Sequence, residues 1–270
     1  MPRPKIALCI GCNYPGTDSE LSGCVNDVRN VAAMLTTQFG FADVRILVDA
    51  DAHEGELPPT HANILAELHK LVADCSCASD VFIHYSGHGS YTRDRSGDES
   101  DGRDEVIMPT DYTQAGMVTD DELNGILSGF RSSVRLTCLM DCCHSGSVLD
   151  LQYTYDLVHG MRIREENATC SIRCDAVMIS GCTDLGTSAD VQDGVQANGA
   201  MTTAFLNVME SFQYIVTCHT LVSEMRLLLQ TQGMIQIPQL SSTCRLNAVT
   251  PFAAVTLYAK SPTLKAVRQR

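Results

Sequence analysis

His84-Tyr85-Ser86-Gly87-His88-Gly89 is one of two stretches that decide the fold of this chain, and Asp141-Cys142-Cys143-His144-Ser145-Gly146 is the other. Each directly follows an apolar, β-branched run that is typical of a buried strand, at residues 80–85 and 134–140. In open α/β sheets, ligands bind just beyond the carboxyl ends of the strands. The pattern therefore predicts a His and a Cys on neighbouring loops, which are the parts that nucleophilic catalysis by a thiolate needs.

The rest of the chain alternates between strand-like and helix-like patterns. Further strands are expected at residues 5–11, 44–48, 175–181 and 251–258, and helices at 26–39, 60–73, around 120–127, 202–212 and 220–232, the second of them capped by Thr60. Residues 89–103 are interpreted as a polar insertion, and residues 155–173 as a flexible joint. Strands that alternate with helices predict an α/β fold with a mostly parallel central sheet flanked by helices on both faces.

Composition and charge exclude several classes of protein. The chain has 270 residues, a net charge of −13 and 13 cysteines. The negative charge argues against nucleic acid and anionic membranes as partners. No apolar run approaches the roughly 20 residues of a membrane span, and the N-terminus lacks the layout of a secretory signal. The cysteines are therefore expected to be thiols in a reducing compartment, and the expected location is the cytoplasm.

Cysteine catalysis needs a base within reach of the thiol. An imidazole can take the proton of a cysteine and later donate a proton to a leaving amine. Cys143 follows His88 at a separation close to the roughly 50 residues that are typical of caspases. Cys142 is a rival nucleophile and His144 a rival base, and the sequence by itself does not choose between the two cysteines.

Other chemistries fit the sequence poorly. The G-x-S-x-G elbow of serine hydrolases would need a glycine where His84 stands. The pairs Cys75/Cys77 and Cys170/Cys174 lack a second Cys or His pair at the spacing of a zinc site. The early glycines form neither a dinucleotide-binding nor a P-loop pattern.

Taken together, the two stretches resemble the catalytic motifs of the metacaspases, which belong to the same clan as the caspases. Three more segments match the family in order, namely residues 21–27 (LSGCVND), 178–182 (MISGC) and 199–202 (GAMT). The similarity covers about residues 5–258 and is greatest to the trypanosomatid members, which have a short linker. It implies a caspase-like fold and a single catalytic domain over residues 1–270, with a large-subunit-like region at about 1–165 and a small-subunit-like region at about 172–260. In a departure from the family pattern, no Pro-rich N-terminal prodomain is expected, because the first expected strand starts near Lys5.

The same resemblance implies a calcium-dependent cysteine endopeptidase that cuts after Arg or Lys through an acyl-enzyme. It assigns His88 as the general base and Cys143 as the nucleophile, with the backbone N–H groups of Gly89 and Cys143 as the oxyanion hole. The residues that would shape the substrate pocket are Cys24, Asp27, Ser86 and Asp141. Two carboxylates there favour a cationic side chain, so the expected partners are proteins or peptides with Arg or Lys at the cleavage site.

An acidic segment adds a candidate metal site. Residues 94–105 carry six carboxylates but lack the spacing of an EF-hand loop, and a solvated charged loop is the plainer interpretation. Calcium takes about six to eight oxygen ligands and tolerates sites that are assembled from separate loops. By resemblance to the family, the ligands of Ca²⁺ would be Asp104, Asp120, Asp121 and Asp150.

Two further expectations concern assembly and processing. The protein is expected to be a monomer. It is also expected to cut itself after Arg162, Arg164 or Arg173, because these arginines lie in the weakly periodic joint, whereas residues 183–198 contain no Lys or Arg. The alternative is that residues 155–173 pack over the core and are not cut. The alternative functions are a catalytically silent caspase-like scaffold and a calcium-responsive regulatory module. Because both motifs keep their His and Cys, the peptidase is favoured over the scaffold.

Overall fold

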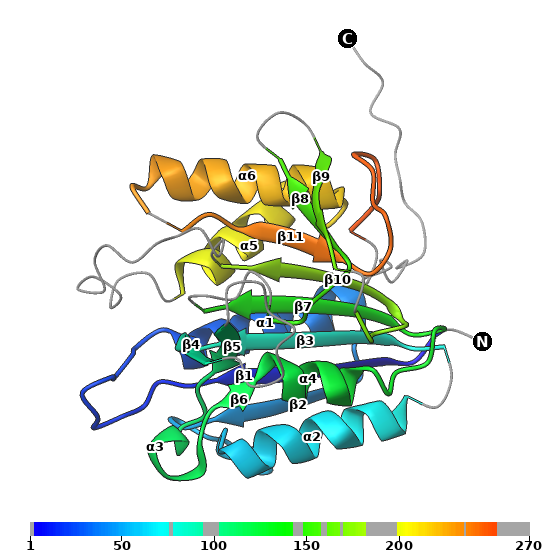
Figure 1. The fold of residues 1–270 in the computed structure, drawn as a ribbon. Coiled ribbons are helices and arrows are strands. Elements are labelled where there is room, and N and C mark those ends of the chain that lie inside the picture. Colours follow the sequence, from blue (N-terminus) through cyan, green and yellow to red (C-terminus); the bar gives the residue numbers. More distant parts are fainter. Residues whose placement is uncertain are drawn as a thin grey trace.

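The fold is built on one large mixed sheet and one small sheet. The structure is a computed structural model, and it describes residues 3–75, 78–93, 103–142, 148–157, 161–167, 170–181, 199–234 and 236–252. Within these residues the large sheet has eight strands in the order β2-β1-β3-β7-β10-β11-β8-β9, and the small sheet has the order β4-β5-β6. Figure 1 shows the large sheet running through the middle of the molecule, with helices in front of it and behind it.

Most of the large sheet is parallel, as its apolar strands predict. β2, β1, β3, β7 and β10 pair in parallel, whereas β11 pairs with β10 and β8 in antiparallel fashion, and β8 and β9 form a hairpin. The strands are β1 (Lys5–Gly11), β2 (Asp43–Val48), β3 (Asp80–Ser86), β7 (Arg135–Asp141), β8 (Tyr153–Asp156), β9 (Arg162–Glu166), β10 (Asp175–Ser180) and β11 (Gln239–Ser242). The predicted α/β class with a mostly parallel central sheet is confirmed.

Helices cover both faces of the sheet. α2 (His61–Asp74) and α4 (Asp120–Leu127) pack on one face with Ile10, Tyr85 and Leu136. α1 (Cys24–Phe39), α5 (Ala200–Ser211) and α6 (Cys218–Thr231) pack on the other, with Phe82 and Leu139. Each fully buried aliphatic or aromatic side chain contributes about 1.5–3 kcal/mol, so these two clusters supply most of the driving force for folding.

The helix boundaries follow local sequence signals. The hydroxyl of Thr60 accepts the N–H of Asn63, which confirms the predicted cap of α2. Thr119 and Glu122 form a capping box at the start of α4. The short helix α3 (Tyr112–Ala115) precedes α4. In the described part of the chain, none of the helices has the length and hydropathy that spanning a bilayer would require.

Two regions differ from the sequence-based expectation. The predicted polar insertion at 89–103 begins and ends in strands, β4 (Gly89–Arg93) and β5 (Arg103–Ile107), which form the small sheet with β6 (Val118–Thr119). The predicted flexible joint at 155–173 contains the β8–β9 hairpin, which extends the large sheet. These strands are short and largely polar, and their pairing comes from tertiary contacts rather than from apolar periodicity.

The last predicted strand, at 251–258, falls mostly on residues outside the described ones. Within the described ones, Pro251 forms an isolated bridge with Thr217. The strand that pairs with the last parallel strand, β10, is instead the antiparallel β11 at residues 239–242, which the sequence did not predict. Its four side chains are buried although three of them are polar, so a search for apolar runs does not detect this strand.

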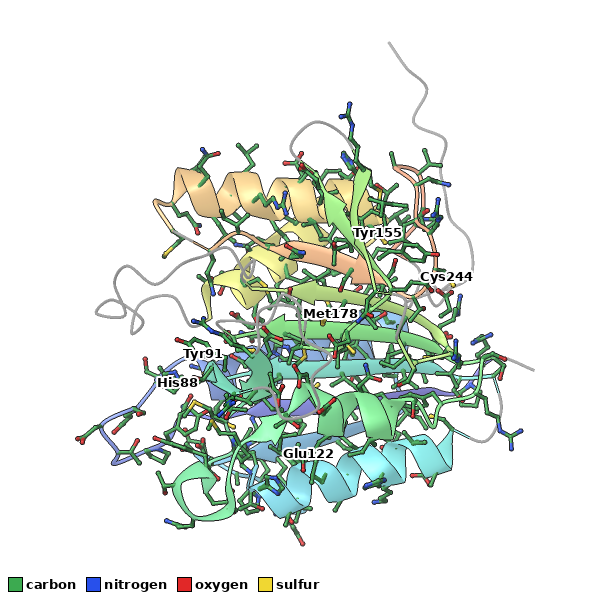
Figure 2. The ribbon with its side chains drawn as sticks, in the orientation of Figure 1. His88, Tyr91, Glu122, Tyr155, Met178 and Cys244 are labelled. Carbon is green, nitrogen blue, oxygen red and sulfur yellow. The ribbon has the colours of Figure 1, made fainter. Side chains whose placement is uncertain are left out.

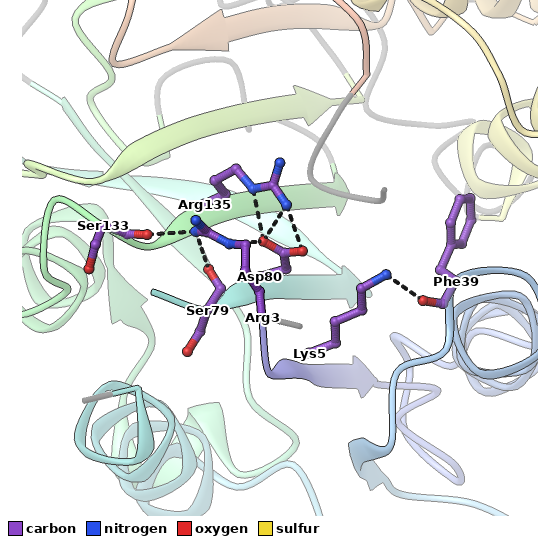
Figure 3. Close-up of polar contacts among 7 residues, drawn as sticks. All are labelled: Arg3, Lys5, Phe39, Ser79, Asp80, Ser133 and Arg135. Carbon is purple, nitrogen blue, oxygen red and sulfur yellow. Dashed lines mark hydrogen bonds and ion pairs between the residues drawn. The ribbon is translucent and has the colours of Figure 1, made fainter. Parts of the chain in front are cut away.

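An ion cluster ties together the amino ends of β3 and β7 (Figure 3). Arg3 and Arg135 both donate to Oδ1 of Asp80 at 2.8 Å, and Arg135 donates to Oδ2 at 2.7 Å. Arg3 also donates to the carbonyl oxygens of Ser79 and Ser133. Asp80 is 1% exposed, so removing its partners would leave a buried charge, which typically costs about 3–5 kcal/mol. This cluster holds the edge of the sheet that lies away from the candidate site.

At the opposite edge, the carboxyl ends of four parallel strands lie level. Gly11 of β1 pairs with Val48 of β2 on one side and with Ser86 of β3 on the other, and Ser86 pairs with Asp141 of β7. The residues that follow these strands therefore emerge side by side. This is the edge at which the two sequence motifs place their polar residues.

Candidate active site

The candidate site lies where the parallel strands end. β3 stops at Ser86, and His88 stands between it and β4, whose first residue is Gly89. Figure 2 shows His88 near Tyr91 at this edge of the molecule, with Cys244 at the other edge. The predicted base and one predicted oxyanion donor are therefore at the expected edge.

The imidazole of His88 is fixed by the loop that precedes α1. Its Nε2 lies 2.9 Å from the carbonyl oxygen of Ser19. Because a carbonyl oxygen can only accept, Nε2 carries the hydrogen of the neutral ring, and Nδ1 is the nitrogen that can take up a proton. A general base oriented through its second nitrogen by another group is the arrangement that thiol activation needs.

The predicted nucleophile, Cys143, lies outside the described residues together with 144–147. The residues before it are placed. β7 ends at Asp141, and the carbonyl oxygen of Asp141 accepts the N–H of Gly87 at 3.3 Å. β7 therefore ends beside the loop that carries His88.

The rival nucleophile, Cys142, is a core residue. Its side chain is 1% exposed and belongs to the hydrophobic cluster that contains Tyr85 and Leu149. A thiol at that depth is out of reach of a peptide substrate, and buried cysteines of this kind are inert. The geometry therefore favours Cys143 over Cys142 as the nucleophile.

Three of the four predicted pocket residues meet at the start of α1. Asp27, in the first turn of that helix, is buried and accepts a 2.7 Å hydrogen bond from the hydroxyl of Ser86. The thiol of Cys24 lies within hydrogen-bonding reach of the same hydroxyl. Burial raises the pKa of the Cys24 thiol to about 12, so this thiol is neutral.

The fourth pocket residue, Asp141, is held by the start of α5. One carboxylate oxygen accepts the backbone N–H of Thr202 at 2.8 Å and its hydroxyl at 2.7 Å. The N–H of Gly199 also donates to this carboxylate, and Nε2 of Gln236 lies 3.5 Å from its second oxygen. The N-terminus of a helix carries a partial positive charge, so α5 stabilises the negative charge of Asp141.

The two buried carboxylates are electrostatically unequal. Burial first, and then the charge of Asp141, raises the pKa of Asp27 to about 7, against a smaller lowering by Ser86. Burial also raises the pKa of Asp141, although its hydrogen bonds with Thr202 favour the charged form. Fewer hydrogen bonds therefore stabilise the negative charge of Asp27 than that of Asp141. A cation placed between the two carboxylates would stabilise the charged form of both.

The predicted calcium ligands lie around the start of α4. Asp120 is buried, and its two oxygens accept the N–H groups of Glu105 and Asp121 at 2.8 and 2.7 Å. Burial is the main cause that raises the pKa of Asp120 to about 6, and the nearby charge of Asp104 contributes. Crowded, buried carboxylates with oxygen donors are chemically suited to a calcium ion.

The fourth predicted calcium ligand, Asp150, stands on a separate loop that α4 contacts. Nδ2 of Asn124 donates to the carbonyl oxygen of Leu149 at 3.2 Å. Asp150 has a left-handed backbone with φ 45°, and its carbonyl oxygen accepts from Asn167. In the part of the chain that the structure describes, no three His, Cys, Asp or Glu side chains are placed to hold one metal ion. The donor chemistry fits calcium, and the ligand set stays a prediction.

Comparison with known proteins decides the family. The family model described as "Metacaspase, peptidase C14 domain" matches residues 5–152. Metacaspase-2 of Trypanosoma brucei brucei is 36% identical, over 95% of this chain and 78% of that protein. The chain belongs to the metacaspase family. The resemblance inferred from the motifs is thereby confirmed, and membership supports the predicted cysteine-type peptidase.

Fungal metacaspases are also similar. Metacaspase-1 of Cryptococcus neoformans is 34% identical over 82% of this chain, and Metacaspase-1A of Aspergillus fumigatus is 38% identical over 75% of it. This metacaspase spans 60% of the length of each of these two relatives.

Solved structures confirm the caspase-like fold. A protein of Geobacter sulfurreducens superposes with a TM-score of 0.62 at 24% identity, over 91% of this chain and 95% of that one. The Drosophila initiator caspase Dronc superposes with a TM-score of 0.51 at 8% identity, over 88% and 78% of the two chains. At these identities the likeness shows the fold alone.

Sequence reasoning missed several residues of the metacaspase site. Asn13 and Asp49 follow the ends of β1 and β2 and bond to one another, and Tyr14 contacts His88. Asn13 and Asp49 obey the same rule that identified His88, because they are polar residues just beyond the carboxyl ends of parallel strands. Applying that rule to all the strands would have found them. Ser19 carries no such signal, because only its backbone oxygen is used.

Proposed function

We propose that this metacaspase is a cysteine endopeptidase that hydrolyses proteins or peptides after Arg or Lys. The observation that carries the proposal is the pair of buried carboxylates, Asp27 and Asp141, at the strand edge that also holds His88. Ser86, which bonds to Asp27, is the last residue of β3 and stands two residues before His88. A cation-binding pocket and an oriented base therefore share one short segment.

In the proposed reaction, Nδ1 of His88 takes the proton of the Cys143 thiol, and the sulfur attacks the carbonyl carbon of the scissile bond. The C–N bond then breaks, the leaving amine takes the proton from the imidazolium, and an acyl-enzyme remains. Water, deprotonated by His88, attacks the thioester and releases the new carboxylic acid and the thiol. The backbone N–H groups of Gly89 and Cys143 would stabilise the oxyanion, and one such donor is typically worth about 10²–10³ in kcat.

Specificity for Arg or Lys follows from the electrostatics of the pocket. An empty pocket holds two carboxylates whose pKa values are raised because burial disfavours their charges. A guanidinium provides several N–H donors and one positive charge, so its binding restores the ionised state that burial opposes. An Asp side chain in the same place would add a third buried negative charge.

Calcium dependence is the second part of the proposal. Asp104, Asp120, Asp121 and Asp150 would hold the ion, which would supply positive charge where carboxylates crowd. The proximity of Asp104 to Asp120, and the contact of α4 with Leu149 beside Asp150, support it. Asp150 is also close along the chain to Cys143, so an ion bound at Asp150 would lie near the catalytic segment in sequence.

The proposal is tested by turnover of a fluorogenic peptide that ends in Arg, beside matched peptides that end in Lys and in Asp. We expect cleavage of the first two, with the Asp peptide slower by about 100-fold or more. Cys143→Ala should be inactive, and Cys142→Ala should retain activity. Equal turnover of the Asp peptide would contradict the specificity, and complete inactivity under all conditions would favour the scaffold.

The calcium requirement has its own test. Activity should disappear with a chelator and return when calcium is added back. Asp120→Asn should need more calcium, whereas Asp43→Asn, an exposed acid on β2, should match the wild type. Full activity in excess chelator would rule out the calcium site.

Self-cleavage between residues 155 and 173 is also part of the proposal. Arg162 and Arg173 are exposed, which supports it, but Arg162 and Arg164 belong to β9, whose pairing with β8 must open before cleavage. Cleavage after Arg173, outside any strand, is therefore expected to be the faster event. Intact-mass analysis after calcium addition, with Cys143→Ala as control, identifies the fragments. An active chain of undiminished mass would contradict a need for processing.

We further propose a monomer in a reducing compartment such as the cytoplasm. The edge strand β9 has the sequence Arg-Ile-Arg-Glu-Glu, and charged side chains on an edge strand oppose edge-to-edge pairing. No disulfide joins the cysteines in the described residues, which accords with a reducing environment. Sedimentation equilibrium tests the assembly state, and a dimer at micromolar concentration would contradict it.

A further inference from the structure

Tyr14 contacts His88 through both its ring and its hydroxyl. The two ring centroids are 5.0 Å apart with an interplanar angle of 32°. The backbone N–H of His88 donates to the hydroxyl of Tyr14 at 3.0 Å, and that hydroxyl donates to the carbonyl oxygen of Met108 at 2.7 Å. One buried side chain thus holds the main chain of His88 and covers one face of its imidazole.

A second tyrosine completes this contact. The hydroxyl of Tyr85 lies 3.2 Å from that of Tyr14 and donates to the carbonyl oxygen of His88 at 2.7 Å. The glycine between Tyr85 and His88 is required by this packing, because a Cβ at Gly87 would come within 2.6 Å of the Tyr85 hydroxyl and 3.1 Å of the Tyr14 hydroxyl. The loop that carries His88 therefore packs directly against the phenol groups of Tyr14 and Tyr85.

Tyr14 is held in place by a carboxylate from another strand. Its φ of 50° lies in the left-handed region, which a bulky residue rarely adopts. The carboxylate of Asp49, just after β2, accepts the N–H groups of Asn13 and Tyr14 at 2.8 and 2.7 Å. These two charge-assisted hydrogen bonds offset the unfavourable conformation and fix the direction of the Tyr14 side chain.

Asp49 is also connected, through Asn13, to the helix that carries the proposed pocket residue Asp27. Oδ1 of Asn13 accepts the N–H groups of Cys24 and Val25 at 3.0 and 3.4 Å, and so caps α1 from outside the helix. The first turn of α1 carries Asp27. Asp49 therefore connects, through neighbouring residues, to the base on one side and to the pocket on the other.

We propose that Tyr14 is a positioning residue for His88, and that Asp49 sets the position of Tyr14. The ring keeps the imidazole at the orientation in which Nε2 meets Ser19 and Nδ1 is turned to accept a proton. When the imidazole takes the thiol proton, the face of the Tyr14 ring also stabilises the resulting cation. This inference rests on the proposed peptidase function, since it assigns a role within that reaction.

The test compares Tyr14→Leu and Tyr14→Phe with Tyr155→Phe. Tyr155 is the matched control, because it is a buried tyrosine whose hydroxyl bonds to Ser242 far from the site. A misplacement of about 1 Å can cost about 10²-fold, so kcat for the Arg peptide should fall about 100-fold in Tyr14→Leu with KM changed less than about twofold. Tyr14→Phe keeps the stacked ring and should fall only about fivefold, and Tyr155→Phe should match the wild type.

Asp49→Asn gives an independent readout with Tyr14 intact. It replaces one of two accepting oxygens by a donor, so kcat should fall about tenfold at unchanged KM. If Tyr14→Leu and Asp49→Asn lose no more kcat than Tyr155→Phe, at equal melting temperature, the positioning role is wrong. The rate of Cys143 alkylation by iodoacetamide, measured on the same variants, decides the inference even if no peptide is cleaved, and should fall in parallel with kcat. A wild type that alkylates rapidly at Cys143 but cleaves no peptide would overturn the proposed function and not the role of Tyr14.

Discussion

Ser86, the last residue of β3, donates a 2.7 Å hydrogen bond to the buried carboxylate of Asp27 in the first turn of α1. This contact joins the strand that delivers His88 to the helix that lines the candidate pocket. The bond lowers the pKa of Asp27, but burial and the charge of Asp141 outweigh it. The buried charge of Asp27 thus lowers the stability of the fold, and in the proposed function a cationic substrate would compensate for it.

Asp27→Asn should therefore stabilise the protein while damaging its function. The pKa of Asp27 is raised to about 7 from its ordinary 3.8, so its contribution to stability is lost as pH rises from about 4 to about 7. Asparagine can still accept from Ser86 and carries no charge. The free energy of unfolding at pH 8 should rise by roughly 1–3 kcal/mol, while KM for the Arg peptide increases at least about tenfold. Urea denaturation measures the free energy of unfolding, and peptide kinetics measure KM. A lower stability of Asp27→Asn at pH 8 would contradict the electrostatic explanation.

The KM for an Arg peptide should depend on pH through the same group. Below about pH 7 Asp27 becomes protonated, and a neutral carboxyl binds a guanidinium less tightly. KM should therefore rise several-fold between pH 8 and pH 6, and this rise should be absent in Asp27→Asn. Kinetics across this range check it, and a KM that is flat with pH in the wild type would show that Asp27 does not contact the cation.

His84 should make the fold sensitive to acid. It is fully buried, its Nδ1–H donates to the carbonyl oxygen of Leu139 at 3.0 Å, and its Nε2 has no partner in the described part of the chain. Burial lowers the pKa of His84 to about 4, so the stability it contributes is complete above about 6.5 and is lost as pH falls towards 4. The wild type should lose roughly 1–3 kcal/mol to this group between pH 7 and pH 4.5.

The matched variants are His84→Asn and His53→Asn. Asparagine at 84 can keep the donor to Leu139 without titrating, so the slope of stability against pH should become shallower. His53→Asn should leave the slope of stability against pH unchanged, because the side chain of His53 is 72% exposed. Unfolding free energies at pH 7, 6 and 5 decide the point, and equal slopes in all three proteins would refute the role of His84.

Gly87→Ala should reduce activity more than stability. The added methyl would push against the hydroxyls of Tyr85 and Tyr14, so the loop that carries His88 must shift. A loss of about 100-fold in kcat is expected for a displacement near 1 Å. Gly125→Ala is the control, because no atom lies within 4 Å of its added Cβ and alanine favours a helix by about 0.5–1 kcal/mol. Wild-type kcat in Gly87→Ala would contradict the packing argument.

The sequence predicts the parallel sheet well because buried strands leave a clear apolar signal. β1, β3 and β10 lie within a residue of their expected bounds, and His88 follows the end of β3 as expected. The β8–β9 hairpin was missed because its contacts are distant in sequence: the hydroxyl of Tyr155 in β8 bonds to Ser242 and Cys244, nearly 90 residues away. Such long-range pairings leave no local periodicity.

The sequence also predicts only some of the residues of the candidate site. Its charged side chains can be predicted, because they are polar residues near the ends of apolar strands. The residues that orient them do so through backbone atoms or aromatic contacts: the carbonyl of Ser19 and the ring of Tyr14 both act on His88 from about 70 positions earlier in the chain. Residue type alone gives no reason to connect them.

The central claim, that Cys143 is a nucleophile beside a pocket for Arg, is tested most directly by a covalent inhibitor. A peptidyl-arginine acyloxymethyl ketone should alkylate the protein once in the presence of calcium, and fragment ions should place the adduct on Cys143. His88→Ala and Asp27→Asn should each slow the labelling, and the matched aspartyl reagent should not react. An adduct on Cys142, or equal labelling by the aspartyl reagent, would contradict the assignment of the nucleophile or of the pocket.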